Sequence, residues 1–275
     1  MKLKKIIFTK MVATGNDFIV IDQRKDLFIK EKDLSKAAAI LCDRRNGIGG
    51  DGALILETSK KCDLKMRIFN ADGTEAEMCG NGLRCASSYV FKNIKRSKNK
   101  LSVEALAGIY IAEAVSPDSI KIKMEDPKDA RLGMLIKLSD RSIRVNYIDT
   151  GVPHTVIFVH GLKDIDVDML GRGIRYHKKF KPRGTNVDFV EVVDDKNIKM
   201  RTYERGVEGE TPACGTGAVA SAAVFSSILK LSTKEIAVDT KGGVLRIYLE
   251  RTKDKIKDVY LEGEVNSVFK GVIDL

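Results

Sequence analysis

An internal repeat constrains the fold of this chain more than any other feature of its sequence. When the 275 residues are shifted against themselves by 134 to 136 positions, five blocks come into register in the same order. The matching blocks are Thr14–Asn16 with Thr150–Val152, Gly49–Asp51 with Gly184–Asn186, Lys65–Asn70 with Lys199–Glu204, Cys79–Gly82 with Cys214–Gly217, and Gly108 with Gly242. Five matches at nearly one offset predict a duplicated unit.

The two halves share one local pattern. Short β-branched runs such as FIVID, ALILE and KMRIF alternate with turn residues and predict strands. Each Cys-Gly-x-Gly motif then opens a helix-like segment, and residues 218–231 are apolar or small nearly all round, which is typical of a buried helix. We predict an α/β fold of the α+β kind with two pseudo-symmetric domains. Each domain is a curved, mostly antiparallel sheet or barrel around a central buried helix.

Composition and charge exclude several classes of protein. The 43% hydrophobic and 31% charged content is that of a globular protein with a real core. The net charge of +10 raises a nucleic-acid-binding module as an alternative, but the lysines are dispersed. The densest run, Lys92–Lys100, lacks aromatic residues and is interpreted as a solvated connection. No apolar stretch is long enough for a signal peptide or a membrane span, so we expect a cytoplasmic protein that binds neither membranes nor nucleic acids.

The five cysteines are an odd number and are widely spread, which favours a reducing compartment over a disulfide framework. No Cys-x2-Cys pair occurs, so no zinc or other metal site is expected. We expect Cys42, Cys62 and Cys85 to be small buried hydrophobic residues, with Cys85 facing the core from its helix.

The Cys-Gly-x-Gly motifs suggest a chemistry. Glycine permits a tight turn with bare backbone amides, and the first amides of a helix carry the positive end of its dipole. A carboxylate can dock there, and a cysteine at that point is expected to have its pKa lowered from about 8.5. Duplication would place two such thiols, Cys79 and Cys214, around one cleft. Two thiols on opposite faces of a carbon can remove a proton from one face and return one to the other, while the helix N-termini hold the charge of the carbanion.

Several segments resemble the diaminopimelate epimerase family. They are TGNDFIVID, FNADGTEAEMCGNGLRCAS, GVPHTVIF, GTNVDFVEV and YERGVEGETPACGTGAVAS, and the resemblance runs from Phe8 to the closing VFKGVIDL. It implies the conversion of LL-diaminopimelate to the meso form, a step of lysine and cell-wall precursor biosynthesis, without pyridoxal phosphate or metal. It also implies a homodimer with a first domain of residues 1–125 and 262–275, a second domain of residues 126–261, and an active site in the cleft between them.

The resemblance also implies roles for individual residues. Cys79 and Cys214 would be the acid/base pair, and His154 and Glu204 would tune the two thiols. Backbone amides for the reacting carboxylate would come from Gly80, Asn81, Gly215 and Thr216. The residues expected to recognise the substrate's amino and carboxylate groups are Asn16, Asn70, Asn186, Glu204 and Arg205. Many relatives read Gly-Asn-Pro-His where this chain has Val152, which cannot make the hydrogen bonds of that asparagine.

Alternatives remain open at this stage. A proline or hydroxyproline racemase of the same fold would usually carry His at the position of Asn81 and would lack the Tyr-Glu-Arg-Gly stretch. A phenazine-type isomerase would lack the cysteine pair. His154 could be structural, and Arg205 could form a structural ion pair with Glu208 or Glu210. Arg44 and Arg45 are expected to support a turn, because no Lys-Ser/Thr follows them as in a phosphate-binding loop.

Overall fold

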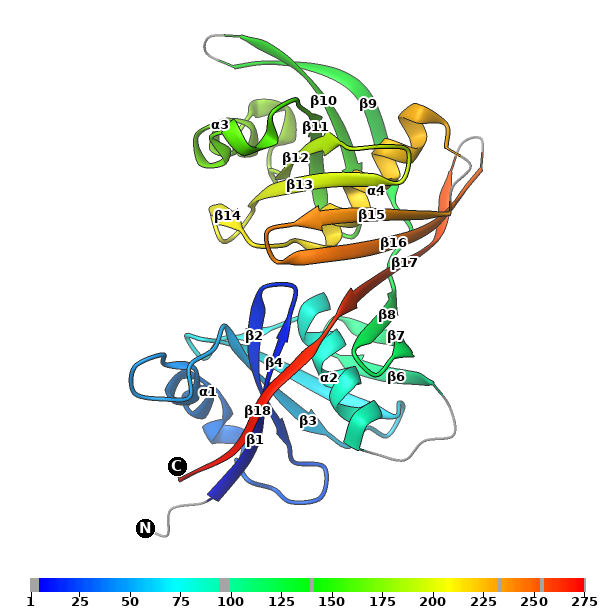
Figure 1. The fold of residues 1–275 in the computed structure, drawn as a ribbon. Coiled ribbons are helices and arrows are strands. Elements are labelled where there is room, and N and C mark those ends of the chain that lie inside the picture. The colour runs from blue at the N-terminus through cyan, green and yellow to red at the C-terminus, as the bar shows by residue number, and fades with distance from the viewer. Residues whose placement is uncertain (1–4, 94–98, 139–140, 232–233, 253–254, 275) are drawn as a thin grey trace. The chain divides into compact units, whose positions relative to one another are not determined.

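The chain folds into two compact units in a computed structural model that describes residues 5–93, 99–138, 141–231, 234–252 and 255–274. Unit 1 comprises residues 1–122 and 263–275, and unit 2 comprises residues 123–262 (Figure 1). The chain passes back from unit 2 to unit 1 within its penultimate strand. Residues 94–98 of the basic run Lys92–Lys100 lie outside the described residues.

Unit 1 is built mainly of strands, with two α-helices. Its strands are β1 (Lys5–Ala13), β2 (Asn16–Asp22), β3 (Gly52–Glu57), β4 (Leu64–Asn70), β5 (Glu75–Ala76), β6 (Lys100–Ala105), β7 (Gly108–Ser116), β8 (Ser119–Lys123) and β18 (Asn266–Asp274). Its helices are the 3-10 helix η1 (Glu31–Asp33), α1 (Leu34–Cys42) and α2 (Gly80–Asn93). Strands pair in the order β18-β1-β2-β3-β4-β6-β7-β8, and of these described pairs β2–β3 and β4–β6 are parallel and the others antiparallel.

Unit 2 repeats this plan. Its strands are β9 (Lys128–Lys137), β10 (Ser142–Asp149), β11 (Pro153–Phe158), β12 (Asn186–Val192), β13 (Asn197–Glu204), β14 (Gly209–Thr211), β15 (Glu235–Thr240), β16 (Gly243–Arg251) and β17 (Ile256–Glu264). Its helices are η2 (Leu162–Asp164), α3 (Val167–Arg175), η3 (Lys178–Phe180) and α4 (Gly215–Leu229). Strands pair in the order β9-β10-β11-β12-β13-β15-β16, and among these pairs of described residues β11–β12 and β13–β15 are parallel and the others antiparallel.

The two units therefore share one topology, as the sequence repeat predicts. α1 connects the parallel strands β2 and β3 as α3 connects β11 and β12, and α2 and α4 make the second parallel connection in each unit. The two units differ in the origin of one outer strand. In unit 1 this strand is β18, which follows the rest of the chain and pairs with β1. In unit 2 it is β9, which directly precedes its partner β10. The predicted α+β fold with a duplicated, mostly antiparallel sheet is confirmed.

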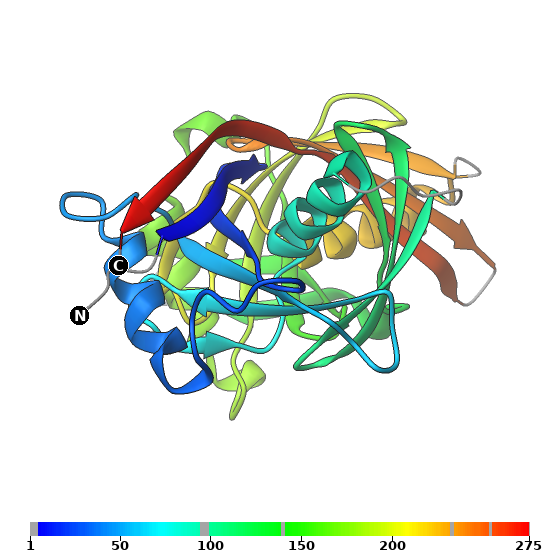
Figure 2. The same cartoon turned by 90° about the horizontal axis from the view of Figure 1, so that it is seen from below.

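A central helix fills the curved sheet of each unit. α2 contacts β1, β2, β3, β4, β6 and β7, and α4 contacts β10 to β13, β15 and β16. Strands curve around both helices (Figure 2). Residues 217–226 of α4 are all buried, which the small and apolar side chains of this segment allow. The predicted buried helix is confirmed, and it begins at Gly215.

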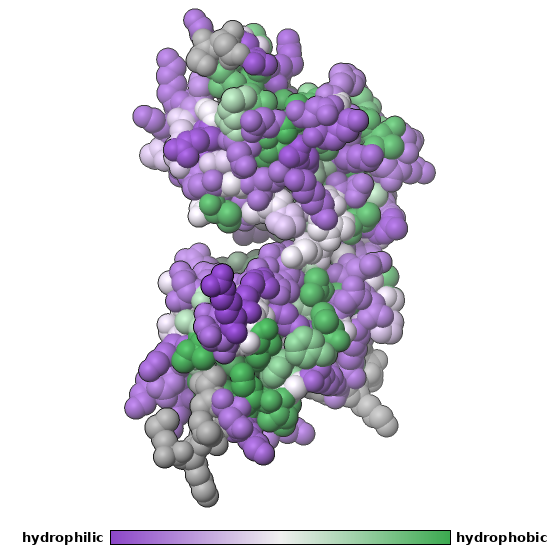
Figure 3. All heavy atoms as spheres, turned by 60° about the vertical axis from the view of Figure 1, so that its left-hand side comes forward, coloured by the Kyte–Doolittle hydropathy of each residue, from purple (hydrophilic) through white to green (hydrophobic). Residues whose placement is uncertain are grey.

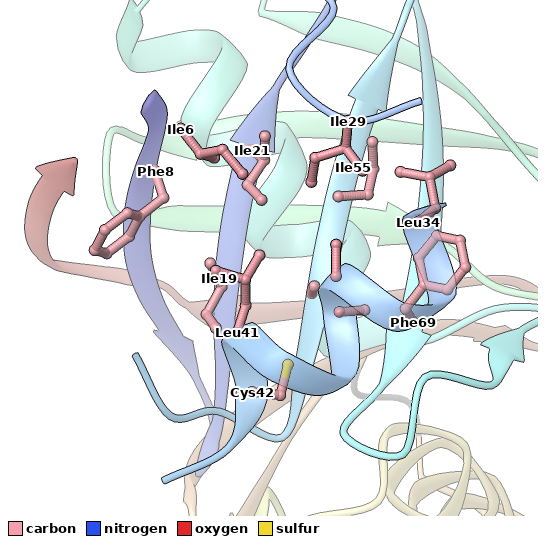
Figure 4. Close-up of a cluster of buried hydrophobic side chains, with 13 residues drawn as sticks. Ile6, Phe8, Ile19, Ile21, Ile29, Leu34, Leu41, Cys42, Ile55 and Phe69 are labelled. Carbon is pink, nitrogen blue, oxygen red and sulfur yellow. The ribbon is translucent and has the colours of Figure 1, made fainter. Parts of the chain in front are cut away.

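The outer face of each sheet is covered by the other α-helix. In unit 1, Leu34 and Leu41 of α1 pack with Ile19, Ile55 and Phe69 of the strands (Figure 4). In unit 2, α3 lies so close to β13 that a Cβ atom at Gly171 would be 2.4 Å from the Cβ of Tyr203, so this contact requires glycine.

Of the three cysteines outside the motifs that were expected to be buried, two are buried. Cys42 and Cys85 are buried. Cys62 is only half-buried, because it lies in the bend before β4, and its assignment as a buried hydrophobic residue is wrong. No described helix is long and apolar enough to cross a membrane.

Candidate active site

Cys79 lies at the N-terminus of α2. The N–H of Leu83 donates to the Cys79 carbonyl oxygen at 2.8 Å, which is the first backbone bond of the helix. The N–H of Gly82 points at the Cys79 Sγ at 3.5 Å. The sulfur therefore lies beside the amides at the positive end of the helix, as the motif predicts.

Asn16 and Asn81 meet at this turn. The Asn81 side chain donates to Asn16 Oδ1 at 2.5 Å, and Asn16 in turn donates to Asp51 at 3.1 Å. The structure thus gathers two of the predicted substrate-binding residues of unit 1 on the Cys79 motif. Asn70 belongs to a different local network at the exposed end of β4, where its side chain donates to Thr74 at 2.9 Å.

Arg44 supports the loop that carries Asp51. Its guanidinium donates to Asp17 at 2.7 Å and to Asp51 at 2.8 Å. Burial alone would raise the pKa of Asp17, but hydrogen bonds from Arg44 and Lys10 hold it well below its usual range. Asp17 is therefore ionised at neutral pH, and the predicted turn-supporting role of Arg44 is confirmed.

Cys214 occupies the equivalent place in unit 2, as the N-cap of α4. Its side chain is 7% exposed, and its Sγ lies 3.4 Å from the hydroxyl of Thr216. The same hydroxyl lies 3.0 Å from Nε2 of His154, whose Nδ1 lies 2.7 Å from a carboxylate oxygen of Asp188. These contacts form a continuous chain from the sulfur to a buried carboxylate.

The buried carboxylate of Asp188 anchors this chain. Asp188 already accepts a hydrogen bond from Thr202 at 2.8 Å, and as a carboxylate it accepts the Nδ1 proton of His154. Nε2 of His154 then faces the Thr216 hydroxyl, whose oxygen also lies 3.4 Å from the Cys214 sulfur. His154 is thus connected to Cys214 through Thr216. This connection would allow His154 to influence the pKa of the Cys214 thiol, as predicted.

The electrostatic setting of Cys214 opposes ionisation. Burial raises the pKa of the Cys214 thiol, the carboxylates of Glu204 and Asp188 raise it further, and the bonds from Thr216 and the Gly217 amide only partly offset this. The expectation that the helix N-terminus lowers the thiol pKa is therefore wrong for Cys214. Burial likewise raises the pKa of Glu204, against a hydrogen bond from Thr211 at 2.8 Å.

Asn186 connects two turns of unit 2. Its amide oxygen accepts the backbone N–H of Arg205 at 2.8 Å, and its amide nitrogen donates to the Pro153 carbonyl at 3.1 Å. The side chain of this buried residue is thus engaged by the backbone, and it holds Arg205 and the start of β11 in place. Val152 contributes its carbonyl oxygen, which accepts from the Thr150 N–H at 3.1 Å.

The guanidinium of Arg205 forms no ion pair with a described carboxylate. Glu208 pairs with Arg175, and Glu210 pairs with Arg201 and Lys241. Among the described residues no carboxylate lies within 4.0 Å of the Arg205 side chain, which donates to the Arg183 carbonyl at 3.3 Å. The alternative of an Arg205 ion pair with Glu208 or Glu210 is therefore wrong. Burial lowers the pKa of Arg205, and the neighbouring Arg175 and Arg183 lower it further.

Three contributors were missed by the sequence analysis. They are Asp188, the hydroxyl of Thr216 and Arg84, a buried cation in α2. The sequence held a signal for two of them. Asp188 is a charged residue within the apolar strand NVDFVEV, and Arg84 is a charged residue within a buried helix. Within the described part of the chain, no group of three or more His, Cys, Asp or Glu side chains is arranged to hold a metal ion.

Comparison with known proteins identifies relatives along nearly the whole chain. The family model described as diaminopimelate epimerase matches residues 8–129 and 146–268. The diaminopimelate epimerase of Caldanaerobacter subterraneus subsp. tengcongensis is 44% identical over 98% of this chain and 99% of its own length. The diaminopimelate epimerase of Archaeoglobus fulgidus is 42% identical over 98% of this chain and 97% of its own length.

Solved structures share the fold at much lower identity. A Bacillus anthracis phenazine biosynthesis protein of the PhzF family has a TM-score of 0.76 and 16% identity, covering 99% of this chain and all of its own. An Agrobacterium vitis hydroxyproline epimerase with bound trans-4-hydroxy-L-proline has a TM-score of 0.68 and 14% identity, covering 99% of this chain and 93% of its own. At this identity the likeness concerns the architecture alone.

Proposed function

The chain belongs to the diaminopimelate epimerase family, and we propose that it inverts LL-2,6-diaminopimelate to meso-diaminopimelate by proton transfer between two thiols and the α-carbon. The observation that carries the proposal is the pair of Cys-Gly-x-Gly turns, with Cys79 and Cys214 each at the start of a buried helix. Both turns lie within the family match to residues 8–129 and 146–268. As a member of the family the chain is an isomerase that acts on a small molecule.

The proposed reaction uses one thiolate and one thiol. The thiolate takes the α-proton and becomes a thiol, while the electron pair left on the α-carbon delocalises into the adjacent carboxylate. The second thiol then gives its proton to the opposite face and becomes a thiolate, so charge and protons balance. The amides of Gly80, Asn81, Gly215 and Thr216 begin the two helices and would hold the carboxylate as its charge grows.

We propose that the two motifs face one substrate in a cleft between domains 1–125 plus 262–275 and 126–261. Arg205 would bind a substrate carboxylate through its planar guanidinium, which suits that group. Glu204, Asn16 and Asn70 would contact the amino and carboxylate groups. Asn186 would act chiefly by holding the Arg205 turn, since backbone groups already engage its side chain. A cytoplasmic location fits this biosynthetic reaction.

We also propose a homodimer formed through β1 and β18. The cross-strand pair Ile7 and Val272 is exposed, as are Val268 and Phe269 of β18. Hydrophobic side chains gather on the surface of this unit (Figure 3). An exposed apolar edge strand favours pairing with another chain. Light scattering should report a dimer that Val272→Lys dissociates, while Val193→Lys at an exposed site of unit 2 leaves it intact.

The reaction is tested by proton NMR in heavy water, with a chelator present and no pyridoxal phosphate added. The enzyme should exchange the α-proton of diaminopimelate and interconvert the LL and meso forms, and it should leave proline unchanged. Exchange of proline but not of diaminopimelate would assign the chain to the rival racemase chemistry. A requirement for added metal or pyridoxal phosphate would refute the two-thiol reaction.

The two bases are tested separately. Cys79→Ala and Cys214→Ala should both fail to invert, because a single thiol reaches one face of the carbon, and each loss should be about 10² to 10⁴-fold or more. Any residual solvent exchange should involve opposite stereoisomers in the two variants. Near-normal inversion by either variant would remove its cysteine from the mechanism.

A further inference from the structure

Arg84 is a charged side chain enclosed in the core of unit 1. It lies one turn into α2, five residues after Cys79, and its side chain is 0% exposed. One nitrogen, Nη2, donates to Asn81 Oδ1 at 2.5 Å and to Thr14 Oγ1 at 2.6 Å. A substrate in solution has no access to this guanidinium, so any role in the reaction must pass through neighbouring residues.

Among the described residues, no carboxylate lies within 4.0 Å of the Arg84 guanidinium. Its hydrogen-bond acceptors are a neutral amide and a neutral hydroxyl, and its Nε and Nη1 have no hydrogen-bond partner in the described structure. A buried cation is costly unless an opposite charge or further hydrogen bonds compensate it. The anion must therefore be sought among the groups that surround Arg84.

Two sulfurs are the groups that attract this cation. Burial lowers the pKa of Arg84, interaction with the sulfurs of Cys85 and Cys79 partly offsets this, and the resulting pKa is about 10. Arg84 therefore stays protonated at neutral pH. Cys85 is a poor counter-ion, because full burial raises the pKa of its thiol strongly. Cys79, which is half-buried and touches the Gly82 amide, is the sulfur that can carry the charge.

The duplicated motif supplies an internal comparison. The position equivalent to Arg84 in α4 is Val219, since 84 and 219 differ by the 135 positions that separate Cys79 and Cys214. Cys214 is instead flanked by the carboxylates of Glu204 and Asp188. One motif therefore carries a buried cation and the other carries buried acids.

We propose that Arg84 is a positioning residue that holds the Cys79 sulfur as the anion in the resting enzyme and orients Asn81 beside it, whereas Cys214 has no such cation and rests as the thiol. The inference rests on the proposed role of the two cysteines as acid and base. It adds Arg84, which was not among the predicted site residues. It also predicts which of the two cysteines is the thiolate before substrate binds.

The test follows thiol alkylation in the substrate-free enzyme. Iodoacetamide is applied over a range of pH, and mass spectrometry measures the rate at Cys79 and Cys214 separately. In the wild type, Cys79 should ionise with a midpoint below the ordinary thiol value of about 8.5, and below that of Cys214. A Cys79 midpoint at or above that of Cys214 would overturn the proposal without any variant.

Arg84→Met removes the charge and keeps an unbranched apolar side chain. The Cys79 midpoint should rise by about one pH unit or more, so that alkylation near pH 7 slows about tenfold, while the Cys214 midpoint stays unchanged. Arg84→Lys should restore most of the shift. Arg67→Met is the matched control, because it removes another enclosed arginine of unit 1 that pairs with Glu75.

A folded Arg84→Met enzyme with an unchanged Cys79 midpoint would show that Arg84 is only structural. Because alkylation requires no substrate, this result is separate from a failure of the epimerase reaction itself. In the active enzyme, the acid limb of kcat/KM against pH should move to higher pH in Arg84→Met and return in Arg84→Lys.

Discussion

The environment of each cysteine, and not the motif it shares with its counterpart, decides its chemistry. A helix N-terminus typically stabilises a negative charge by about 0.3–1 kcal/mol, whereas one pKa unit corresponds to about 1.4 kcal/mol. Burial and two carboxylates can therefore outweigh the helix at Cys214, and the pKa of its thiol is raised. At Cys79 the same helix effect acts together with a buried guanidinium.

Replacement of Glu204 by Gln tests this account of Cys214. The substitution removes a carboxylate that disfavours the thiolate, so the pH midpoint of Cys214 alkylation should fall while that of Cys79 stays constant. Iodoacetamide kinetics with peptide mass spectrometry measure both in one experiment. An unchanged or higher Cys214 midpoint would show that the Glu204 carboxylate does not contribute to the raised pKa of this thiol.

Replacement of Arg205 by Lys tests carboxylate recognition. A point charge cannot make the paired hydrogen bonds of a guanidinium, so kcat/KM for diaminopimelate should fall by about tenfold or more. Arg183→Lys is the control, because Arg183 is exposed and already paired with Asp149. Equal kcat/KM values for Arg205→Lys and the wild type would reassign Arg205 to a structural role.

At the scale of elements, the first turn of each central helix packs against a neighbouring strand, and the space there differs between the two units. A Cβ atom at Gly217 of α4 would be 2.5 Å from Oδ1 of Asp188 on β12, which is fixed by His154 and Thr202. For a Cβ atom at the equivalent Gly82 of α2, the nearest atom would be the Leu54 Cδ2 methyl at 3.0 Å. The second glycine of the motif therefore has a stricter role in unit 2.

Gly217→Ala and Gly82→Ala form a matched pair that tests this difference. Gly217→Ala should destabilise the protein by about 1–3 kcal/mol and displace Asp188, so that inversion slows sharply. Gly82→Ala should reduce both the stability and the rate of inversion by less, because the Leu54 methyl group can move away. Denaturant unfolding and NMR epimerisation assays report the two effects, and equal losses in the two variants would contradict the structural account.

At the scale of the whole molecule, the C-terminal segment completes the unit that begins the chain. β18 pairs with β1 from Lys5 with Asp274 to Val12 with Asn266, with a register shift between Lys10 and Met11, so residues 266–274 form part of the sheet of unit 1. The two-thiol reaction adds a further requirement, since both sulfurs must come within roughly 3 to 4 Å of one carbon.

This requirement predicts a redox sensitivity. In the empty enzyme, a modest approach of the two sulfurs would reach the disulfide length of about 2.05 Å. A mild oxidant should therefore inactivate the enzyme through a Cys79–Cys214 link, a thiol reductant should restore activity, and bound diaminopimelate should protect. Mass spectrometry of the inactive form that shows no such link would contradict the proposed meeting of the motifs.

The sequence by itself determined the elements that depend on local pattern. The repeat predicted one topology used twice, and the run of small and apolar residues after Cys214 predicted the buried α4. The motifs located both cysteines at helix N-termini, because a glycine turn before a helix is a local feature.

Only the tertiary structure decided what surrounds each motif. Asp188, His154 and Thr216 are up to 62 residues apart, and they meet because β11, β12 and α4 pack together. The half-buried position of Cys62 and the partners of Glu208 and Glu210 depend on the same long-range packing. A thiol pKa is set by burial and by charges brought from distant segments, so the raised pKa of Cys214 and the buried charge of Arg84 could not be predicted from motifs alone.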